Sequence, residues 1–221
     1  MIDNMMNELK RSLISYASFV RDMLSKSIEG LSKRNINILE EIINDLEPYA
    51  NAKELEIDEF CIASIAQFQP KGKQLRQIIM TLKINNDLER IADHAVNISE
   101  AAIKLFSYPL SSISDEILKM ANQVISMFDD AIASFSYEDS EKAILVCESD
   151  NKIDDLNEKI ILSFLSNSAS SMEEKASSLS LVLISRNLER VADLSTNIAE
   201  DVYYIATGKV LKHHLSEDKT K

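Results

Sequence analysis

The sequence predicts an all-α protein made of two tandem, pseudo-symmetric three-helix bundles, six helices in all. Its 221 residues include only 3 Gly and 3 Pro, and they contain no convincing run of the alternating pattern typical of strands. The block from Lys83 to Glu100 recurs one hundred positions later, from Leu183 to Glu200, with nine identical residues. A repeat of this kind indicates a duplicated structural unit. We place the first bundle at residues 1–110, the second at 111–208 and a polar tail at 209–221.

The first half is expected to hold three helices. Residues 4–29 form the first, which ends at Gly30, because glycine commonly terminates a helix. The second spans 31–67, with Pro48 marking a kink or a restart. A Pro-Lys-Gly turn then leads into the third helix, residues 73–106, which carries the first copy of the block.

The second half repeats this order after a short connector that contains Pro109 and several serines. Its helices are expected at residues 115–135, 137–166 and 172–207. Ser171 and Glu174 have the spacing of a capping box at the start of the last helix.

Each copy of the block is an amphipathic helix with a row of oxygen ligands on its polar side. The apolar stripe of the first copy is Ile84, Leu88, Ile91, Ala95, Ile98 and Ala102, and its polar row is Glu89, Asp93, Asn97 and Glu100. The second copy has the corresponding row Glu189, Asp193, Asn197 and Glu200. Carboxylates four residues apart on a helix repel one another, and the cation next to them in sequence, Arg90 or Arg190, is expected to point about 100° away. A row of carboxylates without a counter-charge suits a metal cation.

The middle helix of each half offers further oxygen ligands at helical spacing. These are Glu47, Asn51, Glu54 and Asp58 in the first half, and Asp150, Asp154 and Asn157 in the second. In an antiparallel bundle, such a face can meet the carboxylate row of the third helix.

The net charge of −12 argues against non-specific binding to nucleic acid or to an anionic membrane. No apolar run approaches the length of a membrane span, and no signal peptide precedes the first helix, so we expect a cytoplasmic protein.

Cys61 and Cys147 form neither a disulfide framework nor a zinc site. A carboxylate-bridged metalloenzyme is disfavoured, because di-iron bundles use Glu-x-x-His pairs in the core and His94 is the only histidine in a predicted helix. No enzyme activity is predicted.

The two blocks read DLERIADHAVNISE and NLERVADLSTNIAE, and by them the chain resembles the PhoU family of phosphate-uptake regulators. The segments IDEFCIASIAQFQPKGKQLRQIIMTLKI, CESDNKIDDL and NIAEDVYYIATG are also similar to that family. The family has glycine where this chain has Ala92 and Ala192, and His94 is replaced by Leu194 in the second copy.

The resemblance implies surface clusters of metal ions, iron or zinc, held by Glu/Asp-x-x-x-Asp motifs. The ligands it implies are Glu89 with Asp93, Glu189 with Asp193, Asp150 with Asp154 and, more loosely, Glu47 with Asn51. Asn97, Asn197 and Asp58 are additional candidates.

The resemblance also implies a regulator that dampens phosphate uptake and the phosphate-starvation response. Its partners would be the ATPase subunit of the phosphate ABC transporter and a phosphate-sensing histidine kinase, so that it reaches the membrane only through them. A homodimer is expected. The alternative is an accessory protein of a single-chain phosphate permease.

Overall fold

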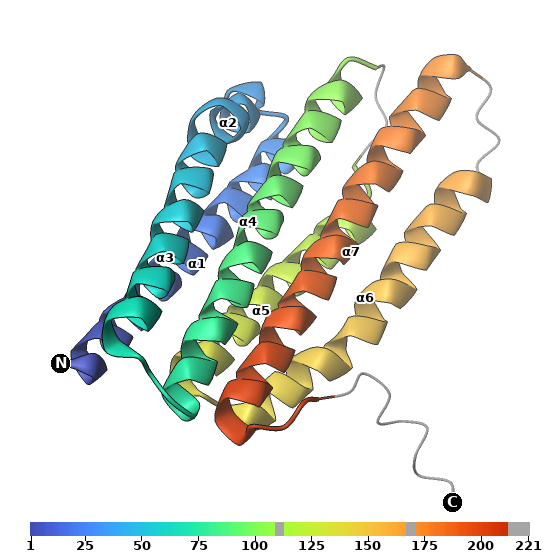
Figure 1. Ribbon diagram of the computed structural model, residues 1–221. Coiled ribbons are helices and arrows are strands. Elements are labelled where there is room, and N and C mark those ends of the chain that lie inside the picture. Colours follow the sequence, from blue (N-terminus) through green and yellow to red (C-terminus); the bar gives the residue numbers. More distant parts are fainter. Residues whose placement is uncertain (109–112, 167–170, 212–221) are drawn as a thin grey trace, which may run out of the picture.

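The computed structural model describes residues 1–108, 113–166 and 171–211, and every regular element in them is helical (Figure 1). The elements are α1 (Ile2–Lys33), α2 (Ile36–Glu41), the π-helical η1 (Ile42–Leu46), α3 (Glu47–Phe68), α4 (Lys73–Phe106), α5 (Asp115–Tyr137), α6 (Ser140–Ser166) and α7 (Met172–Thr207). Since α2, η1 and α3 follow one another directly, they form one rod, and each half has three rods. The all-α prediction with two tandem three-helix bundles is confirmed. The predicted connector lies partly, and the tail mostly, outside the described residues.

Helix α1 runs past the end predicted for it. It continues to Lys33 and ends at Arg34, whose φ of 52° is left-handed and whose N–H donates to the carbonyls of Gly30 and Leu31. Gly30 lies inside the helix because α2 packs against it there. A Cβ at Gly30 would come within 2.6 Å of Leu39 Cδ2. This glycine therefore permits a close approach between helices and does not end the helix.

The second rod starts later than predicted and is interrupted close to Pro48. Asn35 forms its N-cap, and the Asn35 side chain accepts a hydrogen bond from the Ile38 N–H. The π-helical turn η1 comes directly before α3, and Pro48 lies in the first turn of α3. Because the rod is continuous, Pro48 interrupts its backbone hydrogen-bond ladder, and the wider π-helical turn η1 lies directly before this interruption.

Both helices that carry the block, α4 and α7, have the predicted bounds. The capping box at Ser171 and Glu174 is present in both directions. Between them, α5 is longer than predicted and α6 begins later, at Ser140. The reason is a turn in which Glu138 has a φ of 50° and Asp139 Oδ1 accepts the N–H groups of Glu141 and Lys142.

The predicted apolar stripe is the centre of the core. Ile84, Leu88, Ile91, Ala95, Ile98 and Ala102 of α4 are fully buried. Figure 1 shows α4 and α7 side by side and running in opposite directions, with α1 and α3 beside α4 and with α5 and α6 beside α7. The two bundles therefore meet along the helices that carry the repeated block, and one apolar cluster extends through both.

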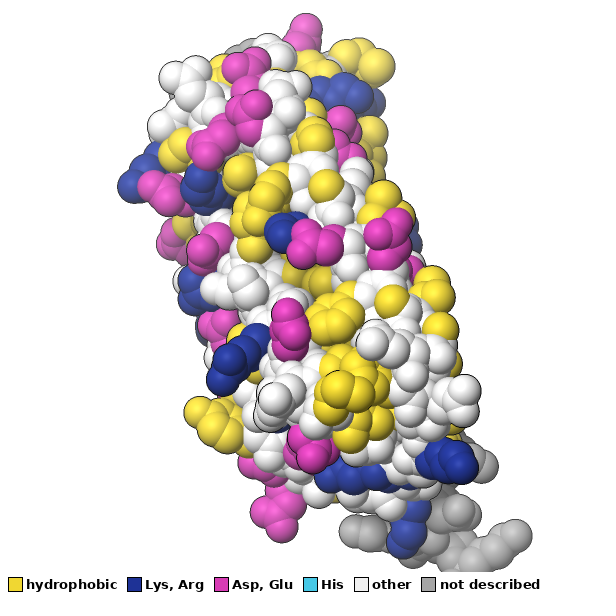
Figure 2. All heavy atoms as spheres, turned by 60° about the vertical axis from the view of Figure 1, so that its left-hand side comes forward, with side chains coloured by type: hydrophobic (Ala, Val, Ile, Leu, Met, Phe, Trp, Pro, Cys, Tyr) yellow, Lys and Arg dark blue, Asp and Glu magenta, His cyan; other side chains and the backbone are white. Residues whose placement is uncertain are grey.

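The outer face of the first bundle is mixed in character. Viewed from the side of α2 and α3, acidic and apolar side chains are interspersed over it (Figure 2), and Leu55 and Ile62 of α3 are each 62% exposed. Among the described helices, none combines the length and apolar character needed to cross a bilayer.

Candidate metal sites

The acidic residues of the first half gather where α3 meets α4. Glu89 and Asp93 of α4 are half-buried there. Burial is the largest cause that raises the pKa of the Glu89 carboxyl, and the charges of Asp93 and Glu54 raise it further. The pKa of Asp93 is raised by burial and then by Glu47. These carboxylates therefore repel one another in a partly dehydrated seam between the two helices.

The other predicted ligands of the first half behave differently from one another. The amide of Asn51 donates to Glu47 Oε1 at 3.2 Å, while the buried Asn51 Oδ1 accepts no hydrogen bond from the described residues. Asp58 is already engaged, because its Oδ1 accepts a hydrogen bond from Asn85 Nδ2 at 2.9 Å. Asn97 is exposed. Glu47 therefore lies with the α4 acids and Asn51 is bonded to it, Asp58 is hydrogen-bonded to Asn85, and Asn97 faces solvent.

The acids of the second half form a tighter group, between α6 and α7. Asp154, Glu189 and Asp193 can each offer a ligand atom such that all three atoms lie within 4.8 Å of one another. The pKa of Asp154 is raised by burial, then by Asp193 and Asp155, and that of Glu189 is raised by burial and then by Asp193. Three carboxylates that converge from two helices can hold a single cation.

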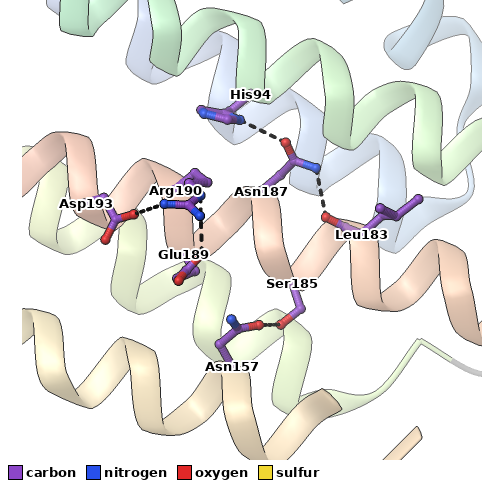
Figure 3. Close-up of polar contacts among 8 residues, drawn as sticks. All are labelled: His94, Asn157, Leu183, Ser185, Asn187, Glu189, Arg190 and Asp193. Carbon is purple, nitrogen blue, oxygen red and sulfur yellow. Dashed lines mark hydrogen bonds and ion pairs between the residues drawn. The ribbon is translucent and has the colours of Figure 1, made fainter. Parts of the chain in front are cut away.

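The prediction that Arg190 points away from the carboxylate row is wrong. Its Nη1 lies 2.9 Å from Asp193 Oδ2, and its Nε lies 3.7 Å from Glu189 Oε2 (Figure 3). The arginine side chain is long enough to fold back along the helix, and repulsion between the two carboxylates favours that conformer. In the first copy, Arg90 instead turns to Asp87, at 3.5 Å. The second site therefore has a partial counter-charge of its own.

Asp150 and Asn197 lie beside this group. Together with Arg90, Arg190 and Asp193 they line a hollow of about 290 Å³ where α4, α6 and α7 meet. Asn157, one turn beyond Asp154, is buried instead, and its Oδ1 accepts a hydrogen bond of 2.6 Å from Ser185 (Figure 3).

The residues present fit an oxygen-bound metal ion. Buried polar atoms in folded proteins nearly always have a hydrogen-bond partner. Here the buried Asn51 Oδ1 accepts no hydrogen bond from any described residue, and the buried Glu189 Oε2 has only the 3.7 Å ion pair with Arg190 Nε. These two atoms belong to predicted metal ligands, one in each half, although buried side-chain atoms of other described residues, Ser64 Oγ and Thr196 Oγ1 among them, also lack a hydrogen bond. Carboxylate and amide oxygens suit hard cations.

A second polar cluster joins the two bundles, and the sequence reasoning missed it. Asp87 of α4 and Asp201 of α7 are both buried, and Lys83 Nζ pairs with Asp201 Oδ1. Burial, followed by the charge of Asp201, raises the pKa of Asp87 to about 6. Along the same helices, His94 Nδ1 lies 2.8 Å from Asn187 Oδ1 (Figure 3). The repeat contained a sign of this cluster, because the position equivalent to Ala101 of the first copy is the acidic residue Asp201 in the second.

Comparison with known proteins relates the whole chain to one family. A family model described as "PhoU domain" matches residues 3–102 and again residues 117–202. The phosphate-specific transport system accessory protein PhoU homolog 2 of Thermotoga maritima is 30% identical over 217 residues, which cover 98% of this chain and 92% of that protein. A PhoU homolog of the same description from Clostridium acetobutylicum is 33% identical over 206 residues, which cover 92% of this chain and 93% of that protein. The crystal structure of the phosphate transport system regulatory protein PhoU from Streptococcus pneumoniae matches with a TM-score of 0.89 at 25% identity, covering 96% of this chain and 100% of that one.

Proposed function

The chain belongs to the PhoU family, and on that premise we propose that it is a non-enzymatic, metal-binding negative regulator of phosphate uptake. The family consists of regulatory and accessory proteins of phosphate transport and not of enzymes. The observation that carries the proposal is that the PhoU domain model matches each half of the chain, over residues 3–102 and 117–202.

Metal binding is the first part of this proposal. Asp154, Glu189 and Asp193 would hold an ion of iron or zinc in the second half, with Asp150 and Asn197 beside them. Glu89 and Asp93, with Glu47 and Asn51, would hold one in the first half. A bound cation would supply positive charge that offsets the mutual repulsion of these carboxylates. The bound cation would also link the middle helix of each bundle to the third helix.

Partner contact is the second part. We expect the chain to bind the ATPase subunit of a phosphate ABC transporter and a phosphate-sensing histidine kinase, and to restrain both when phosphate is plentiful. Two similar bundles present two similar faces, so one molecule can contact two copies of a partner. Engaging both faces makes the second contact intramolecular and strengthens binding by roughly 10²–10⁴-fold if the geometry allows.

Affinity capture of the tagged chain from cells grown with and without phosphate tests the partner contact. We expect the transporter ATPase and the kinase to be captured, more of each in high phosphate. The double variant Asp154→Ala, Asp193→Ala should capture less, while Asp155→Ala, which removes the exposed neighbouring acid, should capture as much as the unaltered chain. Capture of neither partner would contradict the proposal. Capture of a single-chain permease in their place would support the alternative accessory role.

A further inference from the structure

The two arginines of the repeated block meet at one hollow. Arg90 comes from α4 of the first bundle and Arg190 from α7 of the second, and both line the hollow of about 290 Å³ where α4, α6 and α7 meet. Because the two helices are antiparallel neighbours, these equivalent residues of the two copies come together there. Two guanidinium groups at one hollow repel each other, and an anion between them would remove that repulsion.

The protein's own carboxylates satisfy these arginines only in part. Arg190 Nη1 lies 2.9 Å from Asp193 Oδ2, but the pair between Arg90 and Asp87 is long, at 3.5 Å. A guanidinium carries several N–H donors in a planar fork, so both side chains keep donors for a ligand. Each arginine side chain is also about half exposed, so an ion can reach the hollow from solvent.

A buried hydroxyl with no partner lines the same hollow. Thr196 of α7 is 1% exposed, and its Oγ1 has no hydrogen-bond partner among the described residues. A helical serine or threonine commonly donates to the carbonyl one turn earlier, as the neighbouring Ser195 does to the Val191 carbonyl at 2.8 Å. A buried hydroxyl left without a partner destabilises the fold. A ligand in the hollow would give the Thr196 hydroxyl its missing partner.

Two carboxylates in the lining determine which anion fits. Asp150 and Asp193 both line the hollow, and a carboxylate only accepts hydrogen bonds. It therefore repels an anion without protons and accepts a hydrogen bond from one that carries an O–H. Inorganic phosphate keeps at least one proton at neutral pH, whereas sulfate has none and phosphate monoesters lose theirs near about pH 6. Carboxylates beside arginines thus favour inorganic phosphate over both of the other anions.

We propose that this hollow binds one inorganic phosphate ion, with Arg90, Arg190 and Thr196 as donors and with Asp150 and Asp193 as acceptors of its O–H. The ion would link α4 of the first bundle to α7 of the second. This inference rests on the role in phosphate regulation proposed above, and it assigns the residues that detect phosphate directly.

Titration calorimetry of the full-length protein at neutral pH tests this, with sodium phosphate, sodium sulfate and O-phosphoserine as probes. The protein is first freed of metal and the chelator is dialysed away, because a metal ion on Asp193 would itself attract phosphate. We expect one phosphate per chain. Sulfate and O-phosphoserine should bind about 100-fold more weakly or not at all, since a site built to bond an O–H rejects an analogue that lacks it.

The variant Thr196→Val removes the hydroxyl and keeps the shape of the side chain. The first copy of the block has Val96 at the equivalent position, so we expect the variant to fold. Without phosphate it should melt at the same temperature as the unaltered protein or higher, because a buried unpartnered hydroxyl is gone. It should bind phosphate roughly 10–100-fold more weakly, as expected for the loss of a hydrogen bond to a charged ligand. Phosphate should therefore raise its melting temperature less.

Two arginine variants test the location of the site. Arg90→Gln should weaken phosphate binding at least as much as Thr196→Val, because it removes a charged donor. Arg11→Gln makes the same change at an exposed arginine of α1 that is not in the lining of this hollow, and it should bind phosphate as the unaltered protein does.

The outcomes separate this inference from the proposed function. Phosphate binding that survives in both Arg90→Gln and Thr196→Val would overturn the site, and equal affinity for sulfate would overturn its selectivity for phosphate. If the purified chain binds no phosphate but captures the ATPase and kinase in a phosphate-dependent manner, this inference is wrong and the regulatory role stands. If the chain binds phosphate as described but captures neither partner, the site stands and the regulatory role is contradicted.

Discussion

Replacing Asp87 by Asn should make the folded protein less sensitive to pH. Asp87 is 8% exposed, and burial together with the charge of Asp201 raises its pKa from 3.8 to about 6. The folded protein then binds this proton more tightly than the unfolded chain does. The associated stability is therefore complete at low pH and is lost as the pH rises through about 6. The pKa of Asp201 is raised as well, by burial, and Lys83 opposes that shift.

The size of this pH effect on the free energy of unfolding follows from the pKa shift of Asp87. At about 1.4 kcal/mol per pKa unit, a rise of roughly two units corresponds to about 3 kcal/mol at most, and about half of it is lost between pH 5 and pH 7.5. Asp87→Asn removes the charge and with it this dependence. Lys83 stays paired with Asp201 in the variant, because its Nζ contacts Asp201 and not Asp87.

Urea unfolding at several pH values between pH 5 and pH 7.5, with chelator present, measures how the free energy of unfolding changes with pH. The unaltered protein should lose stability relative to Asp87→Asn by about 1–1.5 kcal/mol across that interval. Asp45→Asn, which alters an exposed acid of η1, is the control, and its curve should parallel that of the unaltered protein. A constant difference between Asp87→Asn and the unaltered protein at every pH would refute the argument that Asp87 changes protonation inside the fold.

Four further outcomes are expected. Leu88→Ala should cost roughly 2–5 kcal/mol in urea unfolding, because this side chain is fully buried. Glu89→Gln in metal-free protein should change stability by no more than about 0.5 kcal/mol or increase it, since it relieves repulsion; a large loss would mean that Glu89 supports the fold. Gly30→Ala should lower the melting temperature although alanine is the better helix former, because the added Cβ clashes with a buried leucine. Elemental analysis of protein purified without chelator should find less metal in Asp154→Ala, Asp193→Ala; equal content would contradict the second-half site.

Elements whose signals are local could be predicted from the amino-acid sequence. The bounds of α4 and α7 follow from an apolar stripe of helical period, a capping box at Ser171 and a glycine at 208, all of which act within a few residues. The duplication followed from the repeated block, because a repeat is a property of the chain alone. The pairing of Glu89 with Asp93, and of Glu189 with Asp193, followed from their spacing on one helix.

The groups that lie opposite each of these residues depend on how the helices pack in three dimensions. A glycine at position 30 could either end a helix or allow a neighbouring helix to pack closely. The position of Leu39, which leaves no room for a Cβ at Gly30, shows that the second reason applies. Asp87 and Asp201 are 114 residues apart and meet only because α4 and α7 pack against each other. Burial and charge–charge interaction depend on distance in space, and a sequence pattern records distance along the chain.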